Sequence, residues 1–239
     1  MGPQWQLAMC KELGRLTTGY ICTKDPTHTV TGMKTCEFIC KQDISKGTTA
    51  TYVHIVANYR EQKADPYRVR CTVGGNLIDF PGDTSTKVVD LVTVKILINN
   101  ILSTPGACAA CINIKDFFLN NKLPKPVYIR FKQDSIPREF WNQHNLDWFA
   151  DADGYIYGKV WKGMYGLPQA GRVADDHLWP CLADAEYKPT AITPGLFKHS
   201  TNSIISSLMV DDFMAQYTSH ANLTHLESTL RQYYEITVD

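Results

Sequence analysis

The sequence lacks an excess of charge of either sign, a long apolar run and a signal sequence. Its 24 Lys and Arg residues balance its 24 Asp and Glu residues, so net charge alone indicates no partner. No uninterrupted apolar run approaches the roughly 18 to 20 residues that a membrane span requires. The N-terminal stretch "MGPQWQLAMCKE" has no apolar core, which excludes a secretory signal peptide. We therefore expect no membrane segment and a cytoplasmic or nuclear location.

Internal repeats and low-complexity tracts are also missing. With 239 residues, 44% of them hydrophobic and 20% charged, the composition is that of an ordered globular protein. A chain of this length forms one large domain or two small subdomains. Residues 205–239 are acidic and residues 120–172 are mildly basic. An acidic centre beside a basic band would suit a cation next to a polyanion.

Eight cysteines are present, and a cytoplasmic protein of this length is expected to keep them reduced. Two pairs have spacings that occur in zinc sites: Cys36 and Cys40 in "CEFIC", and Cys108 and Cys111 in "CAAC". Both pairs lie in apolar, strand-like surroundings without the tight turns of a zinc ribbon or finger. We interpret them as core cysteines and keep a zinc-binding module as an alternative.

Hydrophobic periodicity predicts a mixture of helices and strands. The predicted helices cover residues 5–16, 86–102, 169–185 and 219–234. The predicted strands cover residues 51–59, 67–73, 107–114 (buried), 127–131, 154–160 and 203–210. Residues 74–76, Gly-Gly-Asn, are predicted to turn the chain into a hairpin through 77–80. Because helices and strands do not alternate strictly, the pattern favours an α+β fold with a largely antiparallel sheet backed by helices.

Two adjacent acids, Asp211 and Asp212, follow the apolar strand 203–210. Successive side chains of a strand point to opposite faces, so the two can act together only if a tight turn intervenes. Two carboxylates brought close together repel each other unless a cation lies between them. Taken alone, the pair is most often a polar hairpin tip.

Five segments in order change this interpretation. "RVRCTVGGNLIDFPGD", "INIKDFFLNNKL", "KGMYGLPQAG", "TPGLFKH" and "SLMVDDF" resemble the reverse transcriptase domain of copia-type retrotransposon polyproteins. The resemblance runs from about Tyr52 to the last residue. It implies a fingers-like region over 51–106 and a palm-like region over 107–239, preceded by a helix and a strand in 1–50. It also implies that the thumb, ribonuclease H and the other polyprotein domains are absent from this chain.

The resemblance implies an RNA-directed DNA polymerase that extends a primer on an RNA or DNA template with deoxynucleoside triphosphates. In such enzymes two Mg²⁺ ions, or Mn²⁺ ions, stabilise the attacking and leaving oxygens. Asp211 and Asp212 match two of the metal-binding acids, but Asn113 stands where most relatives have the other aspartate. An amide lacks the charge and the second anionic oxygen that bridge two cations. The hypothesis is therefore an impaired enzyme. Asp116, which matches a backbone contact to the triphosphate, is not expected to rescue it.

Other positions match nucleotide-binding residues of the family. Phe118 matches the aromatic residue that excludes ribonucleotides, with a plain core aromatic as the alternative. Arg68 and Arg70 resemble cations of the fingers that clamp the triphosphate. Alternation puts both on one strand face, which is equally expected of a solvated face. Gln169 matches a glutamine near the nucleotide and the template.

The glycine-rich segment around Gln169 suggests close approach to nucleic acid. The glycines of this segment are Gly163, Gly166 and Gly171. Lys159, Lys162 and Arg172 form a candidate cluster facing phosphates. Trp161 and Tyr165 either stack on bases or lie in the core. Three functions stay open: a reverse transcriptase with residual activity, a non-catalytic remnant that binds nucleic acid, and the zinc-binding module.

Overall fold

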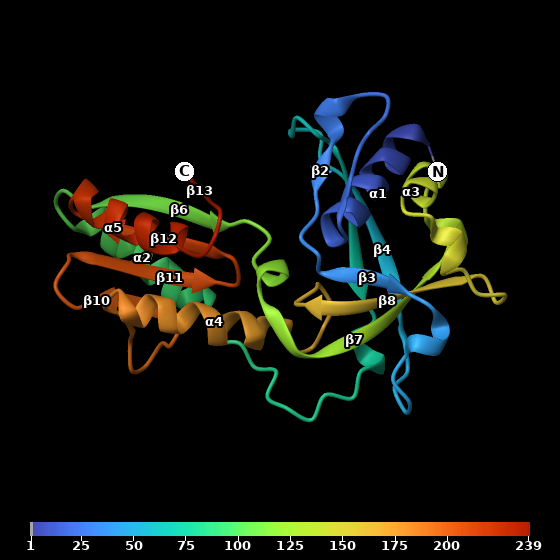
Figure 1. Ribbon diagram of the computed structural model, residues 1–239. Helices are drawn as coiled ribbons and strands as arrows, with labels where there is room; N and C mark the ends of the chain where they lie inside the picture. The colour runs from blue at the N-terminus through green and yellow to red at the C-terminus, as the bar shows by residue number, and fades with distance from the viewer. Residues whose placement is uncertain (1) are drawn as a thin grey trace. The chain divides into compact units, whose positions relative to one another are not determined.

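The computed structural model describes residues 2–239 and shows an α+β protein, as predicted (Figure 1). The chain divides into two compact units. The first unit runs to Gly82 and resumes over Phe118–Ala170, and the second comprises Asp83–Phe117 and Gly171–Asp239. Each unit contains a sheet of its own.

The first unit contains a five-stranded sheet with the strand order β3-β8-β7-β4-β5 and a two-stranded sheet, β1-β2. Its elements are α1 (Pro3–Leu16), β1 (Gly19–Tyr20), β2 (Val30–Thr31), β3 (Cys36–Ile39), β4 (Thr51–Tyr59), β5 (Tyr67–Val73), β7 (Lys122–Lys132), α3 (Arg138–Gln143) and β8 (Tyr155–Lys162). All strand pairs are antiparallel except β4 and β7, which are parallel.

Helix α1 packs along β5, the outer strand of the five-stranded sheet. Met9, Leu13 and Leu16 on its apolar stripe are buried. The outward N–H groups of an outer strand have no neighbouring strand to bond to. Glu12, only 5% exposed, accepts the backbone N–H of Cys71 on β5 at 2.9 Å. A buried carboxylate on α1 therefore takes the place of a strand at this edge.

The second unit contains a six-stranded antiparallel sheet with the order β13-β6-β12-β11-β10-β9. Its elements are α2 (Leu91–Ser103), β6 (Cys108–Ile114), α4 (Ala170–Asp184), β9 (Tyr187–Pro189), β10 (Leu196–His199), β11 (Ile204–Met209), β12 (Asp212–Tyr217), α5 (His220–Arg231) and β13 (Ile236–Val238). The largely antiparallel sheet expected from the sequence is present.

The six-stranded sheet carries helices on both faces. Figure 1 shows α4 and α5 on one face and α2 on the other. Trp179 of α4 contacts Phe197 of β10, with 5.2 Å between the ring centres. From the other face, Asn100 of α2 donates a hydrogen bond to Gln216 of β12 at 2.6 Å. Because side chains alternate along a strand, Asp212 lies on the same face of β12 as Gln216, and the buried Phe213 lies on the opposite face.

Most of the long predicted elements are confirmed. Strands β4 and β5 match their predicted ranges, helix α1 begins two residues before the predicted residue 5, and α4 matches residues 169–185 within a residue. The predicted helix 219–234 ends earlier, as α5 at Arg231. The short strands β1, β2, β9 and β13 have two or three residues each, too few to show a periodicity in the sequence.

The predicted hairpin through residues 77–80 is wrong. Strand β5 pairs back with β4 instead, and Gly75–Leu77 forms a 3₁₀ turn. The N–H of Val73, the last residue of β5, donates to the carbonyl of Tyr165 at 2.7 Å. A Cβ atom at Gly75 would collide with the carbonyl of Gly166. The chain after β5 is therefore held against the glycine-rich loop and forms no new strand.

Helix α2 begins later than the predicted residue 86. The side chain of Asp90 accepts the backbone N–H of Thr93 at 2.7 Å and caps the helix, so residues 86–90 stay outside it. Of its residues only Leu97 is buried, and Leu102 is 80% exposed. The amphipathic pattern thus predicted the helix correctly, although most of its apolar side chains contact solvent.

Strand β6 exposes both of its cysteines, Cys108 and Cys111, and is therefore not the fully buried strand that was predicted. The core-cysteine interpretation is correct for Cys36, whereas Cys40 is half-buried. Buried and less buried side chains alternate from Ala110 to Ile114, which puts Cys111 on the less buried face of β6, whereas Cys108 is the exposed first residue of the strand. Within residues 2–239, no three or more His, Cys, Asp or Glu side chains form a group that could hold a metal ion.

The two units interleave along the chain, whereas the sequence predicts contiguous regions over 1–50, 51–106 and 107–239. Residues Phe118–Ala170 return to the first unit because β7 pairs with β4 and β8 pairs with β3. Helix α2, predicted in the region 51–106, belongs instead to the second unit. The compact units thus have other bounds than the fingers-like and palm-like regions that the resemblance implies, and that assignment stays a prediction.

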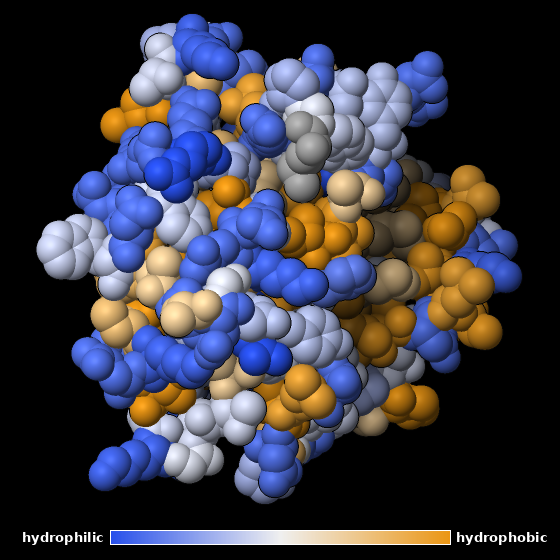
Figure 2. Space-filling model, turned by 90° about the vertical axis from the view of Figure 1, so that its right-hand side faces the viewer, coloured by the Kyte–Doolittle hydropathy of each residue, from blue (hydrophilic) through white to orange (hydrophobic). Residues whose placement is uncertain are grey.

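The surface is mainly polar but carries isolated apolar areas. In Figure 2, hydrophilic residues predominate over the left and centre of the view and hydrophobic ones gather toward its right edge. The large apolar side chains that are more than half exposed include Ile21, Leu91, Val92, Ile96, Trp148 and Ile192. None of the helices in the described part of the chain has both the length and the apolarity needed to cross a bilayer.

Candidate functional site

A tight hairpin displays the acidic pair at the end of β11, as the sequence predicts. Met209 pairs with Asp212, so only Val210 and Asp211 form the turn. Val210 has φ 62°, a conformation that is costly for a β-branched residue, by roughly 1 to 3 kcal/mol. The carbonyl of Asp211 accepts the N–H of Ile114 at 2.8 Å, which fastens the turn to the end of β6. The strained turn is thus held by the pairing of β11 with β12 and by the hydrogen bond from Ile114.

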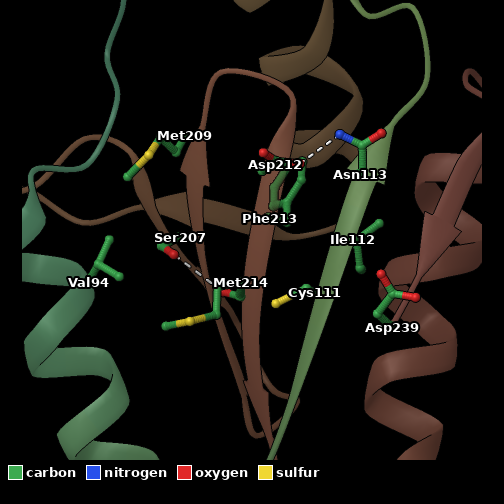
Figure 3. Close-up of a pocket in the computed structure, with 10 residues that line it drawn as sticks. All are labelled: Val94, Cys111, Ile112, Asn113, Ser207, Met209, Asp212, Phe213, Met214 and Asp239. Carbon is green, nitrogen blue, oxygen red and sulfur yellow. Dashed lines mark hydrogen bonds between the residues drawn. The ribbon is translucent and has the colours of Figure 1, made fainter. Parts of the chain in front are cut away.

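Asn113 lies directly opposite Asp212, although 99 residues separate them in the sequence. The side-chain Nδ2 of Asn113 donates a hydrogen bond to Oδ1 of Asp212 at 2.7 Å. Figure 3 shows the two side chains meeting at the same end of β6 and β12. The resemblance assigns residue 113 and the acidic pair to one site, and the structure brings Asn113 and Asp212 together.

The donor groups at this end of the sheet are the carboxylate of Asp212 and the amide of Asn113, and Asp211 is in the adjoining turn. Mg²⁺ prefers oxygen ligands, and the carboxylates of the two aspartates with the amide oxygen would suit one cation. They do not suit two bridged cations, because the amide offers a single neutral oxygen. An aspartate at position 113 would put two carboxylates at hydrogen-bonding distance, where they repel each other unless a proton or a cation intervenes. Asn113 satisfies Asp212 without either.

A pocket of about 340 Å³ adjoins this pair. Its lining residues come from α2, three strands and the last residue: Val94, Cys111, Ile112, Asn113, Ser207, Met209, Asp212, Phe213, Met214 and Asp239. Neither Asp211 nor Asp116 is among these described residues. The pocket therefore has a largely apolar lining, with polar side chains at Asn113, Ser207, Asp212 and Asp239 (Figure 3).

No pattern in the sequence indicates that Asp239 belongs to this pocket. The backbone of Asp239 exchanges two hydrogen bonds of 2.9 Å with Cys111, which extends the pairing of β13 with β6. Strand β13 is too short to be recognised from its pattern. Asp239 reaches the pocket because β13 pairs with β6, and this pairing joins strands that are distant in the sequence.

Asp116 lies in the turn that follows β6 and is half-buried. Its φ of 53° is left-handed, a conformation that aspartate tolerates better than most residues. The preceding Lys115 forms an ion pair with Glu235 at 2.8 Å. Asp116 is therefore outside the strand register that pairs Asn113 with Asp212. Its predicted contact with a triphosphate stays a prediction.

In the first unit, Tyr165 joins two of the predicted nucleotide-binding residues. The guanidinium carbon of Arg70 lies 4.5 Å from the centre of the Tyr165 ring. The Phe118 ring lies 5.3 Å from the same ring, edge to face. Tyr165 is half-buried and so is not a plain core residue, and its stacking on bases stays a prediction. Tyr165 thus joins Arg70 and Phe118 in one cluster, whereas the sequence indicated each of these residues separately.

The Tyr165 loop requires glycine at position 166. Gly166 has φ +90°, and a Cβ atom there would collide with the carbonyl of Val73. Further along, Gln169 is 4% exposed, and its buried Oε1 has no hydrogen-bond partner within residues 2–239. Its predicted place near a nucleotide and template is untested. A buried oxygen without a partner is costly, so Gln169 is a residue to examine by mutation.

The predicted phosphate-facing cations have other contacts. Lys162 donates to the carbonyl of Met33 at 2.6 Å, and burial lowers its pKa. Lys159 lies 4.1 Å from the centre of the Trp161 ring. Arg172, in the second unit, pairs with Asp176 and Asp83 at 2.9 Å each, and Asp176 raises its pKa. The charge of Arg172 is therefore already neutralised.

No protein-family model and no curated protein matches the chain. Among solved structures, one match is a telomerase from Candida albicans in complex with the TWJ fragment of telomeric RNA. The TM-score is 0.45 and the identity 10%, and the match covers 85% of this chain and 43% of that one. This chain thus spans less than half the length of the telomerase chain. A likeness of this size assigns neither residues nor activity.

Proposed function

We propose that the chain contains a copia-type reverse transcriptase domain whose nucleotidyl-transfer site is impaired by Asn113. The observation that supports the proposal most directly is the pairing of Asn113 with Asp212 beside the strained turn that carries Asp211. The five sequence segments that resemble the family supply the reaction class. Template, primer and deoxynucleoside triphosphates are the corresponding partners.

In this proposal Asp211 and Asp212 hold Mg²⁺ or Mn²⁺ at the hairpin. When bound, such ions stabilise the attacking and leaving oxygens of nucleotidyl transfer. The sequence resemblance assigns a phosphate of the nucleotide to Arg70 and its sugar to Phe118. Asn113 holds Asp212 in place by the 2.7 Å hydrogen bond but contributes no charge. The site therefore keeps its arrangement while lacking the anionic group that would bridge two ions.

A second candidate function is a non-catalytic remnant that binds nucleic acid. The hydrogen bond between Asn113 and Asp212 favours it, because this bond satisfies one Asp212 oxygen without a cation. Both candidates share the fold and the partner class. They differ in whether any nucleotide transfer survives.

Primer extension on a primed RNA template separates the two. We expect the wild-type chain to extend the primer at least about 100-fold more slowly than Asn113→Asp, the loss typical of removing one preorganised charged group. The matched control is Asn113→Asp combined with Asp212→Asn, which should be as slow as the wild type.

Template binding, followed by fluorescence anisotropy, should be the same in all three proteins. If neither the wild type nor Asn113→Asp extends the primer while both still bind the template, the result would support the non-catalytic remnant. Equal extension by the wild type and Asn113→Asp would refute the role assigned to Asn113.

A further inference from the structure

A pocket of about 180 Å³ lies between α1 and β5 in the first unit, apart from the residues proposed above for catalysis. Four cations line it, Lys11 and Arg15 from α1, Arg60 from the β4–β5 loop and Arg68 from β5. Only two carboxylates, Glu12 and Asp65, accompany them. The pocket therefore has more positive than negative charge.

The two carboxylates are already engaged. Glu12 pairs with Arg15 at 2.6 Å, and Asp65 pairs with Lys11 at 2.7 Å. Arg60 reaches only the backbone carbonyl of Asp65, at 3.3 Å, and its buried Nε has no hydrogen-bond partner among residues 2–239. Within the same residues Arg68 forms no hydrogen bond and no ion pair. Two guanidinium groups at the pocket thus lack a counter-charge.

Holding these groups together is unfavourable without an anion. Burial lowers the pKa of Arg68, and the nearby charges of Arg70, Arg60 and Arg15 lower it further. Half-buried like charges gain little screening from solvent. An anion placed among them would exchange this repulsion for charge-assisted hydrogen bonds.

We propose that Arg60, Arg68 and Arg15 form a site for one phosphate group. The planar guanidinium fork matches the geometry of phosphate oxygens. The volume is below the range of roughly 300 to 1,000 Å³ typical of whole small-molecule sites, so the pocket suits a single phosphate group and not a complete nucleotide. The pocket is not lined by Arg70, Phe118 or Tyr165, although Arg70 is close to Arg68, and its phosphate binding does not depend on the proposed polymerase activity.

A phosphate group of this kind belongs either to a nucleic-acid backbone or to a free phosphate compound. The test titrates the full-length chain, free of divalent metal and at constant ionic strength, with oligothymidylate or inorganic phosphate. The readouts are the NMR signals of the arginine Nε–H groups and the thermal unfolding midpoint. Arg68→Gln is compared with the matched change Arg138→Gln, at an exposed cation of α3 that does not line the pocket.

We expect phosphate or oligothymidylate to shift the Nε–H signals of Arg60 and Arg68 and to raise the unfolding midpoint. Arg68→Gln should weaken binding by about tenfold, as the loss of one charge-assisted hydrogen bond predicts, and Arg138→Gln should not. Tighter binding of oligothymidylate identifies a nucleic-acid backbone, and equal binding identifies free phosphate.

Without ligand, Arg68→Gln should unfold at the same temperature as the wild type or higher, since it removes repulsion. This result distinguishes a binding residue from a structural one. Absent signal shifts with both ligands, or an equal loss of binding in Arg138→Gln, would overturn the proposal.

Discussion

A single side chain determines how the acidic hairpin is stabilised. Asn113 carries an NH₂ group where aspartate has its second carboxylate oxygen, and this NH₂ group donates a hydrogen bond to Asp212. The departure from the family pattern could be seen in the sequence. Its partner could not, because the sequence did not reveal which of Asp211 and Asp212 faces residue 113. The register of β6 and β12 places Asp212 opposite Asn113.

His199, at the end of β10, is a second residue whose environment could not be predicted. It is 4% exposed, and its Nδ1 accepts the N–H groups of Thr201 and Asn202 at 3.1 and 3.0 Å. Burial and the neighbouring His225 lower its pKa, while Glu186 acts in the opposite direction. The 199–202 turn therefore depends on a neutral imidazole.

The free energy of unfolding should accordingly fall in mild acid. Because the pKa of His199 is lower in the folded chain, its contribution is complete above the unfolded value of about 6.5 and decreases as pH falls below it. Burial also lowers the pKa of His144, so both residues contribute. Denaturant unfolding between pH 5 and pH 7.5 should show a shallower decrease for His199→Gln, by at most about 1.4 kcal/mol per pH unit. The same pH profile in wild type and variant would contradict this.

At the scale of elements, periodicity predicted the long helices and strands but not the turns that connect them. Helix α1 and strand β5 follow from their patterns. The residues after β5 were predicted as a strand because Gly-Gly-Asn is a common hairpin turn. The hydrogen bond from Val73 to Tyr165, 92 positions further on, prevented it, and no local pattern reports such a contact.

The protection of the β5 edge by α1 yields a stability prediction. Glu12→Ala would leave the N–H of Cys71 without a partner and the half-buried Arg15 without its carboxylate. We expect the chain to lose about 3 kcal/mol in the free energy of unfolding.

Glu12→Gln is the matched control, because its amide oxygen can still accept the Cys71 N–H. Its loss should be about 1 kcal/mol. Urea unfolding followed by circular dichroism measures both. Equal losses would show that the hydrogen bond to Cys71 is not the main contribution.

At the scale of the whole molecule, the chain builds two units from interleaved segments. The α+β class and the antiparallel sheet follow from the mixture of elements in the sequence. The interleaving does not, because β7 and β8 pair with strands that precede them by 78 residues (Thr51 to Ile129) and 124 residues (Cys36 to Val160). The same long-range pairing creates the candidate site, since β6 and β12 are distant in sequence and adjacent in the sheet.

The most direct test of the account is a titration of the chain with Mn²⁺, in which electron paramagnetic resonance measures how tightly the ion binds. Asn113→Asp restores an acid opposite Asp212 and should bind Mn²⁺ about tenfold or more tightly than the wild type. Adding Asp212→Asn should abolish the gain. Equal Mn²⁺ binding by the wild type and Asn113→Asp, or a gain that persists without Asp212, would contradict a shared cation site at the ends of β6 and β12.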